Sequence, residues 1–372
     1  MTQSVFVISK PMVPPWNDSG KNIAMELVTH GNRYAYRVLT TKDFQFENQP
    51  GISYERIYPS GGTFQAGLKQ NVKVMFSGLR KKGATVYHYF FAPNKLSATA
   101  GRVQRMATRV KTVQTFCSRP AHYDNMDELI FTDKVIVLSN HTREQLLNAG
   151  VSPGRVVHIP PGIAPPAPIT EEERANIRNK YRLGDNRVIL FPGDYEFSDT
   201  ANRVANAAHE LLTEKKDRCL LFACRAKTEK SQAKKAAIQS QLRGLENRVM
   251  FLDEIDDMPR LVGAVDVVLL PQTNLYAKMD IPLVLLEAMA HGIPLVVADS
   301  GPLQELATQQ AGLAVSGDTD DIAHQVNQIM EDSVLAERLG KNGKQLTHSR
   351  YNSITMAKEI EKLYDELLET DQ

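Results

Sequence analysis

The second half of the chain alternates short apolar runs with helix-forming segments, and this alternation constrains the fold more than any other feature. The apolar runs are typical of buried strands, and the segments between them carry helical periodicity. Strands are expected at 188–191, 219–224, 248–252, 266–270, 293–298 and 312–315. Because a helix follows almost every strand, we predict a parallel sheet with right-handed crossovers. The first half repeats this order from its apolar run at 5–8, so the chain is predicted to be an α/β protein with two such sheets.

A proline-rich segment separates the two halves. The 372 residues of the chain are enough for two domains of ordinary size. The sequence Ala-Pro-Pro-Ala-Pro at 164–168 is typical of a stiff linker. We therefore predict a first domain at 1–163, a linker at 164–170 and a second domain at 171–351. Thr170 and Glu173 have the spacing of a capping box, which would begin the first helix of the second domain.

The composition excludes several classes of protein. Hydrophobic residues make up 42% of the chain and the net charge is +1, which is typical of a globular protein and gives no basis for bulk nucleic-acid binding. The three cysteines lack the spacing of a metal site, and no apolar run is long enough for a membrane span. The absence of GxGxxG disfavours a dinucleotide oxidoreductase. We expect a cytoplasmic protein without a bound metal.

Residues 278–305 are the most informative stretch. Pro282 suits the first turn of a helix, residues 283–290 favour that helix, and Gly292 is a plausible stop. The first backbone N–H groups of a helix lack helical acceptors and can bind an anion. Glu287 is the lone carboxylate of this apolar helix, so it needs a partner or a hydroxyl-rich ligand. An alternative is a core helix in which Glu287 pairs with an arginine.

The stretch resembles the nucleotide-binding helix of the retaining glycosyltransferases of family 4, which have the GT-B fold. Their pattern is roughly Glu-Gly-Phe-Pro-x-x-x-x-Glu-Ala-x-Ala-x-Gly-x-Pro-Val-Val-Ala-x-x-x-Gly-Gly-x-x-Glu. Met279 occupies the position of the first Glu of the pattern, and Asp280 follows it. The residues in register are Pro282, Glu287, Ala288, Ala290, Gly292, Pro294, Val296, Val297, Ala298, Gly301 and Glu305.

The resemblance implies two Rossmann-like domains whose parallel sheets face a central cleft, with a last helix at about 352–372 packing back on the first domain. It also implies transfer of a sugar from a nucleotide-sugar donor to a glycan, glycolipid or other glycoconjugate acceptor, as in polysaccharide biosynthesis, with no metal. The protein would be cytoplasmic, with or without peripheral contact at the inner membrane face. Two alternatives remain: a non-catalytic relative that binds a sugar or a partner protein, and a nucleotide-sugar epimerase.

The resemblance places most donor contacts in the second domain. Glu287 would accept hydrogen bonds from the ribose diol, and the helix start at Leu283 and Val284 would face the diphosphate. Glu254 and Ile255 would meet the base through backbone groups. In the first domain, Gly20 is what remains of a Gly-Gly pair near the diphosphate.

The chain departs from the family pattern at the basic residues. Where the family has an arginine and, five residues later, a lysine, this chain has Asp194 and Asp199. Our hypothesis is that Arg225, Lys227 and Lys278 supply the missing positive charge. Asp280 either replaces the first Glu of the pattern in catalysis or only caps the helix that begins at Pro282.

The acceptor side is less well marked in the sequence. A histidine often occupies the position of Cys117 in the family, so Cys117 and His88 are the acceptor-side candidates; a buried thiol and a structural histidine are the alternatives. Arg102, Arg105 and Arg109 share one face of a predicted helix. That stripe is either a solvated helix face or a contact for an anionic acceptor or membrane phosphates.

Overall fold

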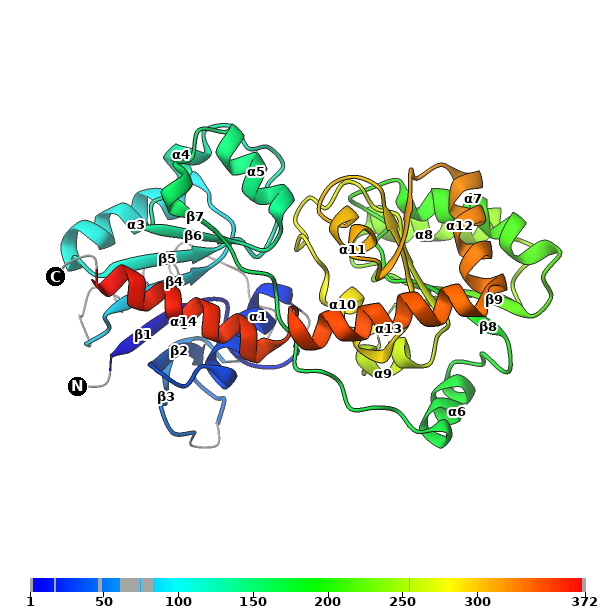
Figure 1. Cartoon of the computed structure of the whole chain (residues 1–372), viewed down its shortest axis with the longest axis horizontal. Coiled ribbons are helices and arrows are strands. Elements are labelled where there is room, and N and C mark those ends of the chain that lie inside the picture. Colours follow the sequence, from blue (N-terminus) through cyan, green and yellow to red (C-terminus); the bar gives the residue numbers. More distant parts are fainter. Residues whose placement is uncertain are drawn as a thin grey trace. The chain divides into compact units, whose positions relative to one another are not determined.

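The computed structural model describes residues 3–16, 18–45, 49–60, 74, 83–253 and 255–369. Residue contacts divide the chain into two compact units (Figure 1). The first unit runs to Ala164 and also contains Tyr276–Asp280 and the chain from Arg350 onward. The second unit contains Pro165–Leu275 and Ile281–Ser349. The segment Tyr276–Asp280 therefore belongs to the first unit, although the sequence around it continues the second.

The first unit contains a seven-stranded sheet in the order β3-β2-β1-β4-β5-β6-β7. All its strand pairs are parallel. The strands are β1 (Ser4–Ile8), β2 (Ala35–Thr41), β3 (Ile52–Tyr58), β4 (Val86–Phe90), β5 (Lys111–Thr115), β6 (Lys134–Val137) and β7 (Val156–His158). The central strand β4 is buried along its whole length, as expected for a parallel strand covered on both faces.

Helices α1 and α5 of the first unit begin at polar caps that the sequence supplies. Asp18 accepts a hydrogen bond from the Lys21 N–H at the start of α1, and Ser139 accepts one from the Thr142 N–H at the start of α5. The helix α14 packs on α1. The helices whose bounds the structure describes are α1 (Ser19–His30), α3 (Lys95–Thr108), α4 (Met126–Leu129), α5 (Asn140–Asn148) and α14 (Ser353–Glu369), with a 3₁₀ turn at Pro153–Arg155.

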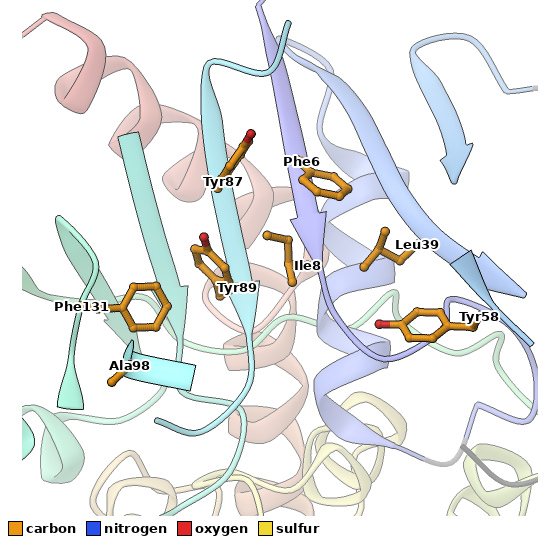
Figure 2. Packing of buried hydrophobic residues seen from close by; sticks show 8 residues of the cluster. All are labelled: Phe6, Ile8, Leu39, Tyr58, Tyr87, Tyr89, Ala98 and Phe131. Atoms are coloured by element: carbon orange, nitrogen blue, oxygen red, sulfur yellow. The ribbon is translucent and has the colours of Figure 1, made fainter. Parts of the chain in front are cut away.

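One part of the first core brings α3 close to the sheet. Figure 2 shows Phe6 and Ile8 of β1 and Tyr87 and Tyr89 of β4, with Phe131 near Ala98 of α3; all belong to one buried cluster. A Cβ atom at Gly101 of α3 would lie 2.2 Å from the Phe131 ring. Only glycine therefore allows α3 to approach that ring so closely.

The second unit contains a six-stranded parallel sheet in the order β10-β9-β8-β11-β12-β13. Its strands are β8 (Arg187–Phe191), β9 (Arg218–Ala223), β10 (Val249–Leu252), β11 (Val267–Leu270), β12 (Leu295–Ala298) and β13 (Gly312–Val315). Its helices are α6 (Glu171–Lys180), α7 (Thr200–Thr213), α8 (Glu229–Gln241), α9 (Met258–Gly263), α10 (Leu283–His291), α11 (Gln304–Thr308), α12 (Thr319–Glu331) and α13 (Ser333–Ser349).

These two parallel sheets confirm the predicted fold class. The capping box at Thr170 and Glu173 also forms, with reciprocal hydrogen bonds at the start of α6. Each sheet has a point at which the strand order reverses: between β1 and β4 in the first unit, and between β8 and β11 in the second. In open parallel sheets, ligands bind beyond the carboxyl ends of the strands at such a reversal, so functional groups are expected at these strand ends.

Candidate functional site

Helix α10 follows β11, one of the two strands at the reversal of the second unit, and its start differs slightly from the prediction. Pro282 is the N-cap of α10 and not its first residue, and no side chain of the described residues caps the helix. The N–H of Leu285 donates to the Pro282 carbonyl at 3.0 Å, so Leu285 does not contribute to an anion site. The N–H groups of Leu283 and Val284 come first in the helix and lack helical acceptors by position. Gly292 ends the helix in the left-handed conformation, as predicted.

Glu287 lies one turn into α10, which packs on α9 and α13. Its side chain is half-buried, and burial, together with the Asp257 carboxylate, raises its pKa to about 7. No residue in the described part of the chain forms a hydrogen bond or ion pair with it. The alternative in which an arginine neutralises Glu287 is therefore wrong for these residues. A carboxylate kept partly desolvated without a cation is typical of a binding or catalytic group.

The strand-end loops at the reversal are joined by side chains. The Gln272 side chain, which follows β11, donates to Asp194 Oδ2 at 3.2 Å. Asp194 Oδ1 in turn accepts from the backbone N–H groups of Glu196 and Phe197, at 2.9 and 2.6 Å. Asp194 therefore shapes the loop after β8 in the manner of an Asx turn.

The second carboxylate at this edge, Asp199, is also compensated. Its Oδ1 lies 3.3 Å from Lys234 Nζ and accepts from the Asn202 side chain at 2.6 Å. Where the family pattern has cations, this chain thus has anions that bond to their own loops and helices. The ion pair with Lys234 partly neutralises Asp199, and Asp194 is bonded to backbone N–H groups of its own loop.

The predicted cations and base contacts follow neighbouring strands of the same sheet. Arg225 and Lys227 come directly after β9 and are exposed, and Ile255 comes after β10 and is half-buried. The carboxyl ends of adjacent parallel strands meet at one edge, so these residues share an edge with the loop after β8. Glu254 lies outside the described residues.

Asp280 is held in the first unit. Its carboxylate is buried and accepts a hydrogen bond from Ser139 Oγ at 2.6 Å. Because the α10 start has no side-chain cap, the N-cap role for Asp280 is wrong. The backbone holds the same segment: Arg119 N–H donates to the Lys278 carbonyl at 2.8 Å, and Ala277 N–H donates to the Arg119 carbonyl at 3.0 Å. Lys278 and Asp280 are thus fixed to the loop after β5 and to the start of α5.

A cationic group that the sequence did not single out lies in the same loop. Arg119 Nη2 is 2.9 Å from His141 Nε2, and the guanidinium lies 5.9 Å from the centre of the Tyr123 ring. Burial, followed by the Arg119 charge, lowers the pKa of His141. Arg119 Nη1 is buried and has no hydrogen-bond partner among the described residues, which is unusual for a guanidinium. The only sequence signal was its place after a strand end.

The acceptor-side candidates are part of the core. His88 is fully buried, and its ring nitrogens lie 2.5 Å from Tyr364 Oη and 2.7 Å from Thr115 Oγ1. Burial lowers the pKa of His88 to about 3, so the ring is neutral near neutral pH. Because both nitrogens already have partners, the structure favours the structural alternative for His88.

Cys117 and Gly20 meet in space although they are far apart in sequence. A Cβ atom at Gly20, in the first turn of α1, would lie 2.8 Å from Cys117 Cβ. Burial, and then the Asp18 carboxylate, raise the pKa of the Cys117 thiol, so it is protonated and weakly nucleophilic. These observations favour the buried-thiol alternative for Cys117 and give Gly20 a packing role.

Two further kinds of feature, a metal-binding cluster and a membrane-spanning helix, do not occur among the described residues. Among them, no group of three His, Cys, Asp or Glu side chains could hold a metal ion. No helix in that same part of the chain is both long enough and apolar enough to cross a membrane.

Comparisons with known proteins bear on the fold and the second unit. Residues 173–346 match the family model described as Glycosyl transferases group 1. The chain is 30% identical to the N-acetyl-alpha-D-glucosaminyl L-malate synthase of Bacillus anthracis over 34% of this chain and 33% of that protein. It is 24% identical to the alpha-D-kanosaminyltransferase of Streptomyces kanamyceticus over 63% of this chain and 60% of that protein. The chain thus spans less than two thirds of either relative.

The whole chain also has a counterpart among solved structures. Anabaena Alr3699/HepE, solved in complex with UDP-glucose, superposes with a TM-score of 0.75 over 97% of this chain and 99% of that chain, at 16% sequence identity. At this level of sequence identity the superposition shows the fold alone. The chain therefore has a GT-B fold, and residues 173–346 of its second unit are similar to the glycosyl transferases group 1 family.

Proposed function

We propose that the protein is a retaining glycosyltransferase that moves a sugar from a nucleotide-sugar donor to a glycan, glycolipid or other glycoconjugate acceptor. The observation that carries the proposal is Glu287, a half-buried carboxylate without a cationic partner among the described residues, one turn after an uncapped helix start. It lies inside the stretch that matches the glycosyl transferases group 1 model. The structural neighbour Alr3699/HepE was solved with UDP-glucose, which supports this class of donor.

Glu287 would bind the ribose diol through its two carboxylate oxygens. Its pKa is raised to about 7 in the absence of donor, and two hydroxyl donors would favour the ionised form and lower that pKa again. Donor binding would then release a proton. The affinity for the donor should accordingly increase as the pH rises from 6 to 8.

The diphosphate would lie at the start of α10, near the N–H groups of Leu283 and Val284. Arg225 and Lys227 would supply charge at the same sheet edge. In retaining transfer, the bond to the diphosphate breaks through an oxocarbenium-like state, so stabilising the leaving group is the main catalytic requirement. Asp280 is our candidate for the group that hydrogen-bonds the donor sugar.

The first experiment is calorimetric titration with UDP-, GDP- and ADP-sugars at pH 6 and pH 8, together with an assay for sugar release. We expect one nucleotide class to bind, with higher affinity at pH 8, and Glu287→Gln to lose that pH dependence. Glu229→Gln, an exposed glutamate of α8, is the matched control. If no nucleotide sugar binds, or if Glu287→Gln binds as tightly as the natural chain, the proposal is wrong.

The role of Asp280 has its own test. Asn at this position keeps an oxygen that accepts the Ser139 hydrogen bond and removes the charge. We expect Asp280→Asn to bind donor normally and to reduce turnover by at least a hundredfold. Unchanged turnover would remove Asp280 from the mechanism and leave it as an anchor of its segment.

A non-catalytic binding protein is the second candidate function. Asp194 and Asp199, where the family pattern has cations, and the buried thiol of Cys117 favour it. Donor binding without sugar release, across a panel of glycan and lipid acceptors, would support this candidate over the enzyme.

A further inference from the structure

The outward face of α3 carries large apolar side chains that are exposed to solvent. Eight large hydrophobic side chains are exposed in the described part of the chain, and three of them are on α3: Leu96, Val103 and Met106, which are 56%, 47% and 73% exposed. On a helix, positions 96, 103 and 106 fall on one side. The opposite side, at Ala98, Gly101, Gln104 and Thr108, is buried. The three apolar side chains therefore form a stripe without a partner among the described residues of the first unit.

The flank of this stripe is cationic. Helix α3 and its C-cap contain Lys95, Arg102, Arg105 and Arg109, and no acidic residue. Arg102 and Arg105 also line a hollow of about 570 Å³ beside α3, together with Arg155, Asp127 and Asp133. Three guanidinium groups thus face two carboxylates in the hollow, and each guanidinium has five N–H donors. The charge on this side of the molecule is complementary to anions.

The arginines are held in place by the chain that α3 covers. Arg102 donates to the Glu128 carbonyl, Arg105 forms an ion pair with Asp133, and Arg155 donates to the Ile130 and Thr132 carbonyls at 2.8 and 2.9 Å. The close approach of Gly101 to the Phe131 ring keeps α3 against this chain. The cationic flank and the apolar stripe are thus presented together on a rigid support.

We propose that α3 is a docking surface for a membrane that contains anionic phospholipids. Leu96, Val103 and Met106 would enter the boundary between headgroups and acyl chains, and Arg102, Arg105 and Arg109 would contact lipid phosphates. An amphipathic helix with cations beside an apolar face is suited to the plane of that boundary, and α3, with 14 residues, is about 21 Å long. This inference is independent of the donor site.

The test is co-sedimentation of the full chain with vesicles of phosphatidylcholine, with and without phosphatidylglycerol. We expect binding only to the anionic vesicles and weaker binding at higher salt. Leu96→Ser with Met106→Ser should weaken that binding by about tenfold, since both apolar contacts are lost. Arg102→Gln should weaken it by about fivefold, the typical contribution of one cation near an anionic surface.

Matched controls separate docking from general effects. Ile354→Ser removes an equally exposed apolar side chain, 66% exposed on α14, and Arg243→Gln removes an exposed cation of the second unit. Both should bind vesicles as the natural chain does. All variants should keep their far-UV circular dichroism and their affinity for a nucleotide sugar, so a failure here is distinct from a failure of the proposed function.

Several outcomes would overturn the proposal. One is equal binding to neutral vesicles, and another is unchanged binding by the double serine variant. Release of the protein by inorganic phosphate, but not by chloride of equal ionic strength, would indicate a phosphate site in the hollow instead. A change in the oligomeric state of the lipid-free double variant would indicate that the stripe is a contact between copies of the chain.

Discussion

Polar groups in the two units differ in whether they have partners: His88 and Asp280 of the first unit do, and Glu287 of the second unit has none among the described residues. In the first unit, His88 is buried with both ring nitrogens bonded to side chains from α14 and β5, and the carboxylate of Asp280 accepts from Ser139. In the second unit, Glu287 is half-buried and has no hydrogen-bond or ion-pair partner among the described residues, and its pKa is raised. Both units have the same kind of parallel sheet, so the fold does not explain the difference.

The difference separates structural groups from candidate binding groups. A buried polar group with all its partners stabilises the fold, whereas one without partners costs stability. Such a cost persists in natural proteins mainly at functional sites. By this criterion Glu287 is the stronger functional candidate, and His88 is a core residue.

The largest expected effect is a loss of stability of the first unit when His88 is removed. His88→Ala leaves the hydroxyls of Tyr364 and Thr115 without their partner and creates a cavity, so we expect a loss of about 3–4 kcal/mol in unfolding free energy. His122→Ala, at an exposed position, is the control and should change stability by less than about 0.5 kcal/mol. Denaturant unfolding measures both. A donor-binding defect in folded His88→Ala protein would contradict the structural assignment.

The next largest expected effect is the change in unfolding free energy with pH that Glu287 causes. Its pKa rises from 4.5 to about 7 on folding, so the folded state binds the proton more tightly. The contribution of Glu287 to stability is therefore most favourable below pH 4.5 and is lost as the pH rises through 7, by up to about 3 kcal/mol at 1.36 kcal/mol per pKa unit. Glu287→Gln should remove this loss and stabilise the chain much more at pH 8 than at pH 5. Equal effects at both pH values would show that burial does not perturb this group.

His88 should give the opposite pH dependence. Its pKa falls from 6.5 to about 3 on folding, so the unfolded chain binds a proton that the folded chain does not. The contribution of His88 to stability is complete above pH 6.5 and is lost as the pH falls toward 3. Unfolding curves of the natural chain, His88→Gln and Glu287→Gln between pH 4 and 8 would separate the two contributions.

A smaller effect is expected at the loop after β8. Asp194→Ala removes the acceptor of two backbone N–H groups and of Gln272, which should cost about 1–2 kcal/mol. Asp199→Ala is the matched control, because its ion pair with Lys234 is largely exposed and should contribute less than about 1 kcal/mol. If the two variants lose equal stability, Asp194 does not organise the loop.

The smallest expected effect is on donor binding, and it tests whether Arg225 supplies the positive charge that the family pattern has at positions 194 and 199. Arg225→Ala should weaken donor binding by about 1 kcal/mol, as expected for one exposed charge near a phosphate. Arg243→Ala removes an exposed arginine that precedes β10 and so lies toward the other edge of the sheet; its donor affinity should not change. If Arg225→Ala binds the donor as tightly as the natural chain, Arg225 does not supply the missing positive charge.

The sequence by itself determined the local architecture. Apolar runs and helical periodicity located both parallel sheets, because burial on both faces of a strand demands a nearly continuous apolar run. The helix caps at Thr170 and Gly292 could be predicted from the sequence because capping depends on residues within one helical turn. Glu287 was noticeable for the same reason, as a charge in an apolar helix.

Only the tertiary structure decided which groups have partners. The sequence placed Lys278 and Asp280 beside α10, but backbone pairing with Arg119 and the Ser139 hydroxyl place them in the first unit. His88 and Tyr364 are 276 residues apart, and no local pattern reports that they meet. The hydrogen-bond and ion-pair partners of a side chain can come from residues far away in the sequence. The bonded ring of His88 and the carboxylate of Glu287, which has no partner among the described residues, can therefore be distinguished only in the folded chain.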